Sequence, residues 1–188
     1  MLYTIFTLLM LTFTSEENTT SSSINAAESS IVWTATKITG SHTGNIQISN
    51  GSLNFEGDQL IGGEFTADMT SINTTDLEGE WKDKLDGHLK SDDFFGVEKF
   101  PTSTFKITSV KLKEGSTYQI TGDFTIKGIS QTVTFPAEVD AAAKSAVATV
   151  TLDRTKFNVR YGSSSFFDNL GDKAISDEFT LGIKIVSE

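Results

Sequence analysis

Hydrophobic and polar residues alternate along most of the chain from residue 31 onward. In the clearest example, residues 118–126, Tyr, Ile, Gly, Phe and Ile alternate with Gln, Thr, Asp and Thr. A period of two is typical of a β-strand with one buried and one solvated face. The same period recurs in seven other segments, around residues 33–36, 45–48, 64–70, 104–108, 132–135, 146–152 and 178–185. We therefore expect an all-β domain of about eight strands.

Short turn sequences separate these segments. Asn50-Gly51 has the strongest hairpin sequence, and Glu114-Gly115 and Lys127-Gly128 also fit tight connections. Strands joined by short turns favour a single antiparallel β-barrel, because closure of the sheet removes its exposed edges.

One segment, residues 75–90, has a different period. Trp81, Leu85 and Leu89 are four residues apart, as on one face of a helix. Thr75 and Glu78 fit a capping box at its start. We expect one short helix that covers an end of the barrel.

The first thirty residues differ in composition from the rest. Residues 1–14 contain an apolar run of signal-peptide length, too short to span a bilayer, and residues 15–30 form a Ser/Thr-rich stretch typical of a disordered linker. The domain would then comprise residues 31–188. The alternative is that the apolar run is a short hydrophobic element of the fold.

Composition excludes several kinds of chemistry. The chain has no Cys, which removes disulfides, thiol nucleophiles and cysteine-based metal sites. Its 25 acidic and 15 basic residues give a net charge of −10, which argues against nucleic acid and anionic membrane as partners.

Catalytic motifs are nearly absent. No nucleophile elbow or phosphate-binding glycine loop is present, and the two histidines, His42 and His88, are 46 residues apart. His88 has four acidic neighbours, which could form a carboxylate–histidine site or a solvated acidic helix edge: Asp83, Asp86, Asp92 and Asp93. We expect no metal and no cofactor.

Binding fits the sequence better than catalysis. Fourteen of the aromatic residues are Phe, against two Trp and three Tyr. An eight-stranded barrel can hold one small ligand or be filled by its own side chains, and periodicity does not distinguish these cases. The residues expected to line such a cavity are Trp33, Phe65, Met69, Phe105, Ile107, Phe124, Ile126, Phe135, Phe157 and Phe179.

The segment 87–105, GHLKSDDFFGVEKFPTSTF, resembles the hallmark stretch of the YceI-like family of bacterial lipid-binding proteins. Residues 121–128, TGDFTIKG, resemble the family's next block, and Asp153-Arg154 with Phe157 resembles its penultimate region. The resemblance extends over about residues 31–186. One departure is Gly96, which replaces the usual Asp after the two phenylalanines.

This resemblance implies a lipocalin-like barrel, exported to the bacterial periplasm or secreted, that encloses a polyisoprenoid or similar apolar lipid without catalysis. Family members are often dimers, and the sequence leaves a homodimer open. The hallmark phenylalanines could lock the helix onto the barrel or contact the ligand. We expect the barrel mouth or a head-group site to include His88, Phe94, Phe95 and Arg154.

Two alternatives to a lipid-binding protein remain at this point. One is a hydrolase or isomerase that uses His88 and neighbouring Asp residues. The other is a surface interaction module whose barrel is fully packed.

Overall fold

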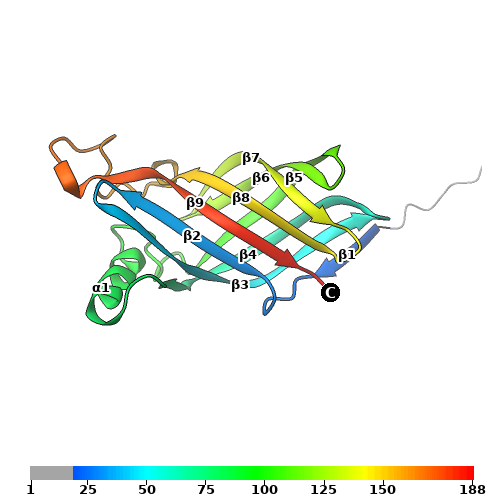
Figure 1. Cartoon of the computed structure of the whole chain (residues 1–188), viewed down its shortest axis with the longest axis horizontal. Helices are drawn as coiled ribbons and strands as arrows, with labels where there is room; N and C mark the ends of the chain where they lie inside the picture. Colours follow the sequence, from blue (N-terminus) through cyan, green and yellow to red (C-terminus); the bar gives the residue numbers. More distant parts are fainter. Residues whose placement is uncertain (1–18) are drawn as a thin grey trace, which may run out of the picture.

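The computed structural model describes residues 19–188, which form nine antiparallel strands and one α-helix (Figure 1). The predicted signal peptide lies outside the described residues. The elements are β1 (Thr19–Ser23), β2 (Ser30–Lys37), β3 (Gly40–Glu56), β4 (Gln59–Thr74), α1 (Gly79–Lys90), β5 (Thr102–Glu114), β6 (Thr117–Ile126), β7 (Ile129–Asp140), β8 (Ser145–Asp153) and β9 (Ile175–Val186), with 3₁₀ turns η1 (Arg154–Phe157) and η2 (Gly171–Lys173).

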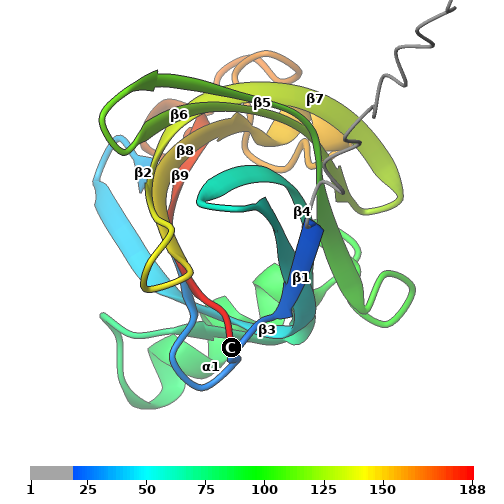
Figure 2. The same cartoon turned by 90° about the vertical axis from the view of Figure 1, so that its right-hand side faces the viewer.

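Eight of the strands close into a barrel, which confirms the predicted fold class. Each strand from β4 to β9 pairs with the next, β9 pairs with β2, β2 with β3, and β3 with β4. Viewed from the end opposite α1, the strands form a closed ring around the barrel axis (Figure 2). The helix and the long β8–β9 connection lie at the other end (Figure 1).

The ninth strand, β1, corrects the predicted disordered linker of residues 15–30 over the part that the structure describes, residues 19–30. Thr19–Ser23 pairs with residues 52–56 in the second half of β3. The sequence TTSSS has no hydrophobic period, and the strand is instead held by its backbone ladder to β3. Side-chain periodicity does not detect pairing of this kind.

Asn50-Gly51 is not a hairpin, contrary to the prediction. Both residues lie inside β3, next to a bulge, and Gly51 pairs with Phe65 of β4. A Cβ on Gly51 would lie 2.5 Å from the Glu64 carbonyl oxygen and 2.9 Å from Cδ1 of Phe65. The glycine therefore permits close approach of two strands rather than a turn. Lys127-Gly128 does form a turn, with both residues at positive φ.

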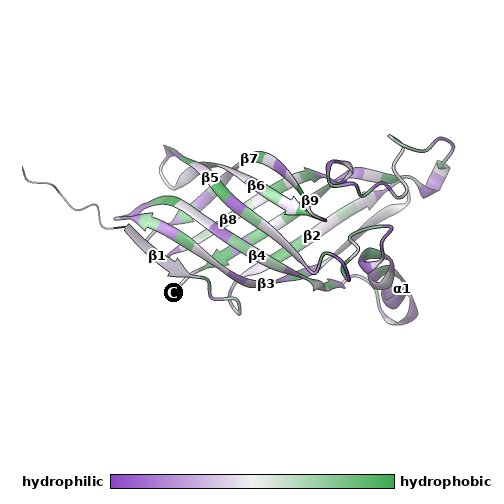
Figure 3. Cartoon of the chain, turned by 180° about the vertical axis from the view of Figure 1, so that it is seen from behind, coloured by the Kyte–Doolittle hydropathy of each residue, from purple (hydrophilic) through white to green (hydrophobic). Residues whose placement is uncertain are grey.

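The alternation of side chains separates the barrel interior from its surface. In β6, every second residue from Tyr118 to Ile126 is buried, and the residues between them are less buried. Figure 3 shows the corresponding alternation of hydrophobic and hydrophilic bands along the strands. The buried residues form one core cluster that extends over all eight barrel strands and reaches α1 through Leu89.

The helix is shorter than predicted. It begins at Gly79 after Glu78, and no side chain caps it. The capping box does not form, because Thr75 is drawn to β3, where its backbone N–H and side-chain hydroxyl both donate to the Thr43 carbonyl. Of the predicted stripe, Leu89 is buried and Leu85 is partly buried, whereas Trp81 is 73% exposed.

Candidate functional site: an apolar cavity inside the barrel

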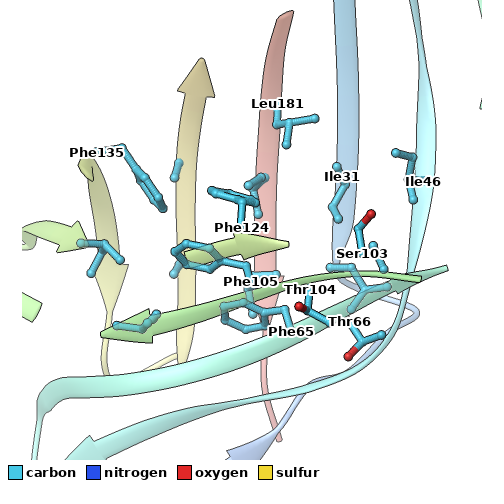
Figure 4. Close-up of a pocket in the computed structure, with 18 of the residues that line it drawn as sticks. Ile31, Ile46, Phe65, Thr66, Ser103, Thr104, Phe105, Phe124, Phe135 and Leu181 are labelled. Atoms are coloured by element: carbon cyan, nitrogen blue, oxygen red, sulfur yellow. The ribbon is translucent and has the colours of Figure 1, made fainter. Parts of the chain in front are cut away.

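The barrel encloses a cavity of about 120 Å³. Figure 4 shows part of its lining, with phenylalanine rings from β4, β5, β6 and β7 facing aliphatic side chains of β2, β3 and β9. None of the lining residues carries a charge, and three have a hydroxyl group: Thr66, Ser103 and Thr104. Such a space favours an apolar ligand through burial of about 25 cal/mol per Å².

The structure places eight of the ten expected lining residues around this cavity. They come from β4, β5, β6, β7 and β9: Phe65, Met69, Phe105, Ile107, Phe124, Ile126, Phe135 and Phe179. Phe95, expected at the mouth, also lines the cavity. It follows α1 and so forms part of the lining at the helix end.

Four phenylalanines form one continuous aromatic wall. The rings of Phe65 and Phe105 lie 6.3 Å apart at an interplanar angle of 4°, and the rings of Phe105 and Phe124 are 4.3 Å apart. Phe135 lies 5.5 Å from Phe105. Gly122 allows this packing, because a Cβ there would lie 2.4 Å from Cζ of Phe105. The wall presents rigid apolar surface without polar atoms.

Sequence reasoning missed many aliphatic lining residues that have the same period of two. They include Ile31, Ile46, Ile48, Ala67, Ile120, Ala137, Ala146, Ala148, Leu181, Ile183 and Ile185. Their inward position was detectable from the alternation. What the pattern did not show is that Ala67, Ala137, Ala146 and Ala148 leave space that larger side chains would fill.

Two expected lining residues lie elsewhere. The indole of Trp33 packs over Gly44, where a Cβ would come within 2.6 Å of the ring, and Trp33 is not in the cavity lining. Phe157 is 2% exposed and lies in η1, within the core rather than along the cavity. Both are buried apolar residues, and periodicity alone cannot separate core from cavity.

Arg154 differs most from its expected role at the mouth. It is 4% exposed, and its guanidinium donates hydrogen bonds to the carbonyl oxygens of Val159, Tyr161, Ile175 and Ser176 at 2.8–3.0 Å. Asp177 lies 3.5 Å away as a counter-ion. The N–H donors of Arg154 therefore hold the β8–β9 connection against the start of β9 and are not directed toward a ligand.

His88 joins three segments at the helix end of the barrel. Its ring meets Phe94 edge-on at 4.9 Å and Tyr161 at 4.4 Å, both at about 80°. Its Nε2 lies 3.7 Å from a carboxylate oxygen of Asp93, beyond hydrogen-bond distance. This packing connects α1, the following loop and the β8–β9 connection, and it fits a structural use of the hallmark residues His88 and Phe94.

The second histidine lies on another element. His42 Nδ1 is 2.9 Å from Asp76, whose other carboxylate oxygen accepts the backbone N–H of Thr43. Burial acts to raise the pKa of Asp76, but these hydrogen bonds outweigh it and hold the pKa below the usual value. Across residues 19–188, no group of three or more His, Asp or Glu residues is arranged to hold a metal ion.

Asp86 ties α1 to the barrel. Its carboxylate accepts the backbone N–H of Thr74 at 2.8 Å and pairs with Lys82. Burial acts to raise the pKa of Asp86, whereas hydrogen bonds from Lys82 and Thr74 lower it, and the net effect is a lowered pKa. The charged carboxylate therefore stabilises the docked helix.

We expect Asp86→Asn to lower the free energy of unfolding by about 1.5–3 kcal/mol at pH 7, the value of hydrogen bonds to a charged group. Because the folded-state pKa is depressed, this stabilisation is present above the ordinary pKa and is lost as pH falls through the folded value. Urea denaturation should therefore show the gap between wild type and variant closing below about pH 4.

The matched control is Asp83→Asn, which removes the same charge from an exposed position of α1. It should cost less than about 0.5 kcal/mol. Equal effects of the two substitutions would show that helix charge, and not the contact with Thr74, is responsible.

The closed barrel and its apolar interior place this protein in the class of barrel binding proteins. The chain belongs to the YceI-like domain family, which matches residues 23–187. Protein YceI of Escherichia coli O157:H7 is 42% identical over 69 residues, which cover 37% of this chain and 35% of that relative. The match therefore spans about a third of the relative's length.

Solved structures share the fold. Burkholderia cenocepacia BcnA superposes with a TM-score of 0.72 at 21% identity, over 88% of this chain and 99% of that one. A polyisoprenoid-binding domain from Saccharophagus degradans, implicated in plant cell wall breakdown, gives a TM-score of 0.65 at 12% identity, over 88% and 98% of the two chains. At these identities the likeness concerns the barrel fold. No helix in the described part of the chain is long and apolar enough to cross a membrane.

Proposed function

We propose that this protein is an exported, non-catalytic carrier that sequesters a polyisoprenoid or similar long apolar lipid inside its barrel. The observation that carries the proposal is the cavity, which is enclosed by strands of a closed barrel and lined by apolar side chains without a charged group. A fully packed interaction module would not need this space.

The family supports the same proposal. A structural neighbour is named a polyisoprenoid-binding domain, and the chain belongs to the YceI-like family. The elongated shape of the barrel in Figure 1 fits a linear ligand better than a compact one. Export to the periplasm or the medium rests on the apolar run at residues 1–14.

Catalysis by His88 and its Asp neighbours has weaker support. The imidazole is held edge-on between two aromatic rings, and the nearest carboxylate, that of Asp93, is 3.7 Å away. In a nucleophile–base pair the base is oriented by a third group, and the Asp93 carboxylate lies beyond hydrogen-bond distance of His88.

The test is native mass spectrometry of the protein purified from its own host, followed by titration with geranylgeraniol, a C20 prenol. We expect a co-purified lipid of prenyl composition, and prenol binding in the micromolar range or tighter. Several lipid-free preparations that also fail to bind the prenol would contradict the proposal.

A further inference from the structure

One polar atom in the cavity wall has no partner. The hydroxyl oxygen of Ser103 is buried and makes no hydrogen bond to the described residues. Ser103 is the second residue of β5, pairs with Ala67, and precedes the inward-facing Phe105 by two positions. In Figure 4 its oxygen lies near Ile31 and Ile46.

A buried hydroxyl without a hydrogen bond is unfavourable, and such groups in native proteins call for an explanation. Alanine would fit the same position on β5 without this cost, as it does at the paired Ala67. The other two hydroxyls of the lining are on Thr66 and Thr104, which pair with each other at the intervening positions of β4 and β5. Only the Ser103 hydroxyl is left both buried and unpaired in this lining.

We infer that Ser103 hydrogen-bonds the single polar end of the bound lipid and fixes the direction in which the lipid lies. The inference rests on the proposed function. Ser103 lies at the helix end of the barrel, where Phe95 also lines the cavity. From there the apolar tail passes along Phe105 to Ile107, away from α1.

The lining also indicates that the polar end of the lipid is uncharged. A phosphate or diphosphate inside the cavity would be buried without a cation, since no Lys or Arg lines it. Burial of an unpaired charge is far more costly than burial of a hydroxyl that gains a partner. The preferred lipid is therefore an uncharged prenol or prenyl ketone, not a prenyl phosphate.

The experiment compares three C20 ligands with the same prenyl chain: geranylgeraniol, the corresponding hydrocarbon without the hydroxyl, and geranylgeranyl diphosphate. Binding to the delipidated full-length protein is measured by native mass spectrometry and by competition with an uncharged, apolar fluorescent probe. The variants are Ser103→Ala, Ser103→Thr, and Ser109→Ala as a matched control at an exposed position of the same strand.

We expect the wild type to prefer the alcohol over the hydrocarbon by about 3- to 10-fold, the range of one net hydrogen bond. Ser103→Ala should abolish the preference for the alcohol with little change in hydrocarbon affinity. Ser103→Thr, which keeps a hydroxyl group, should retain the preference, and Ser109→Ala should leave it intact. The diphosphate should bind at least about 10-fold more weakly than the alcohol.

Failure of this inference differs from failure of the proposed function. If alcohol and hydrocarbon bind equally, or the preference persists in Ser103→Ala, the role of Ser103 is wrong although the protein still binds lipid. Comparable binding of the diphosphate would overturn the assignment of an uncharged head group. If none of the three ligands binds, the proposed function fails and the role of Ser103 with it.

Discussion

Arg154→Ala is expected to lower the free energy of unfolding by about 3–5 kcal/mol, the cost of breaking a buried ionic network by removing one partner. Four backbone carbonyls accept hydrogen bonds from this guanidinium, and all would lose their donor. The side chain is 4% exposed, so water could replace these bonds only if the β8–β9 connection opened. Thermal and urea denaturation measure the loss.

The geometry explains why only arginine serves at this position. Nε and both Nη atoms donate in different directions, to residues 159 and 161 on one side and residues 175 and 176 on the other. Lysine has one nitrogen and cannot reach both segments from a single point. We expect Arg154→Lys to recover less than half of the lost stability.

Asp177 completes this network. Burial acts to raise its pKa, but hydrogen bonds from serine hydroxyls, including that of Ser165, and the positive charge of Arg154 hold the pKa below the usual value. Asp177 is thus charged at neutral pH and compensates the buried cation.

Arg160→Ala is the matched control for Arg154→Ala. Arg160 is in the same connection, but it is exposed, and its guanidinium lies 4.6 Å from the Phe166 ring centre. Its removal should cost less than about 1 kcal/mol. A loss of under 1 kcal/mol for Arg154→Ala would contradict the structural role assigned here.

The sequence allowed prediction of the barrel because a period of two is a local property. The alternation in residues 118–126 alone determines which side chains of β6 are buried, and similar rows predict the other barrel strands. Local patterns could not show that Asn50-Gly51 lies inside a long strand, because the role of Gly51 depends on Glu64 and Phe65 across the ladder. β1 was missed for a similar reason, since its TTSSS sequence pairs through the backbone.

The site was predictable in outline but not in detail. Rows of Phe and Ile predict an apolar interior, whether or not it contains a cavity. The space depends on where small residues such as Ala137 and Ala148 lie relative to one another, and they are brought together by the β7–β8 pairing. The burial of the Ser103 hydroxyl without a hydrogen-bond partner likewise depends on tertiary structure. In sequence, Ser103 is one more serine in a chain rich in Ser and Thr.

Ala148→Phe is expected to weaken lipid binding on the order of 100-fold while the barrel stays folded. Ala148 lines the cavity from β8, between Ala137 of β7 and Ile183 of β9. A phenyl group there would project into the space assigned to the prenyl tail. Exclusion of about four methylene groups, at about 0.8 kcal/mol each, corresponds to a loss of affinity on the order of 100-fold for geranylgeraniol.

The added ring should cost about 1–3 kcal/mol of stability, as overpacking usually does, so circular dichroism and thermal denaturation should still show a folded barrel. Thr149→Phe places the same ring on the adjacent, exposed position of β8 and should leave both affinity and stability nearly unchanged. Ala67→Leu fills the cavity from β4 with a smaller group and serves as a second test if Ala148→Phe fails to fold. If either folded variant binds the prenol as tightly as the wild type, the lipid does not occupy the barrel, because one space cannot hold both the new side chain and the tail.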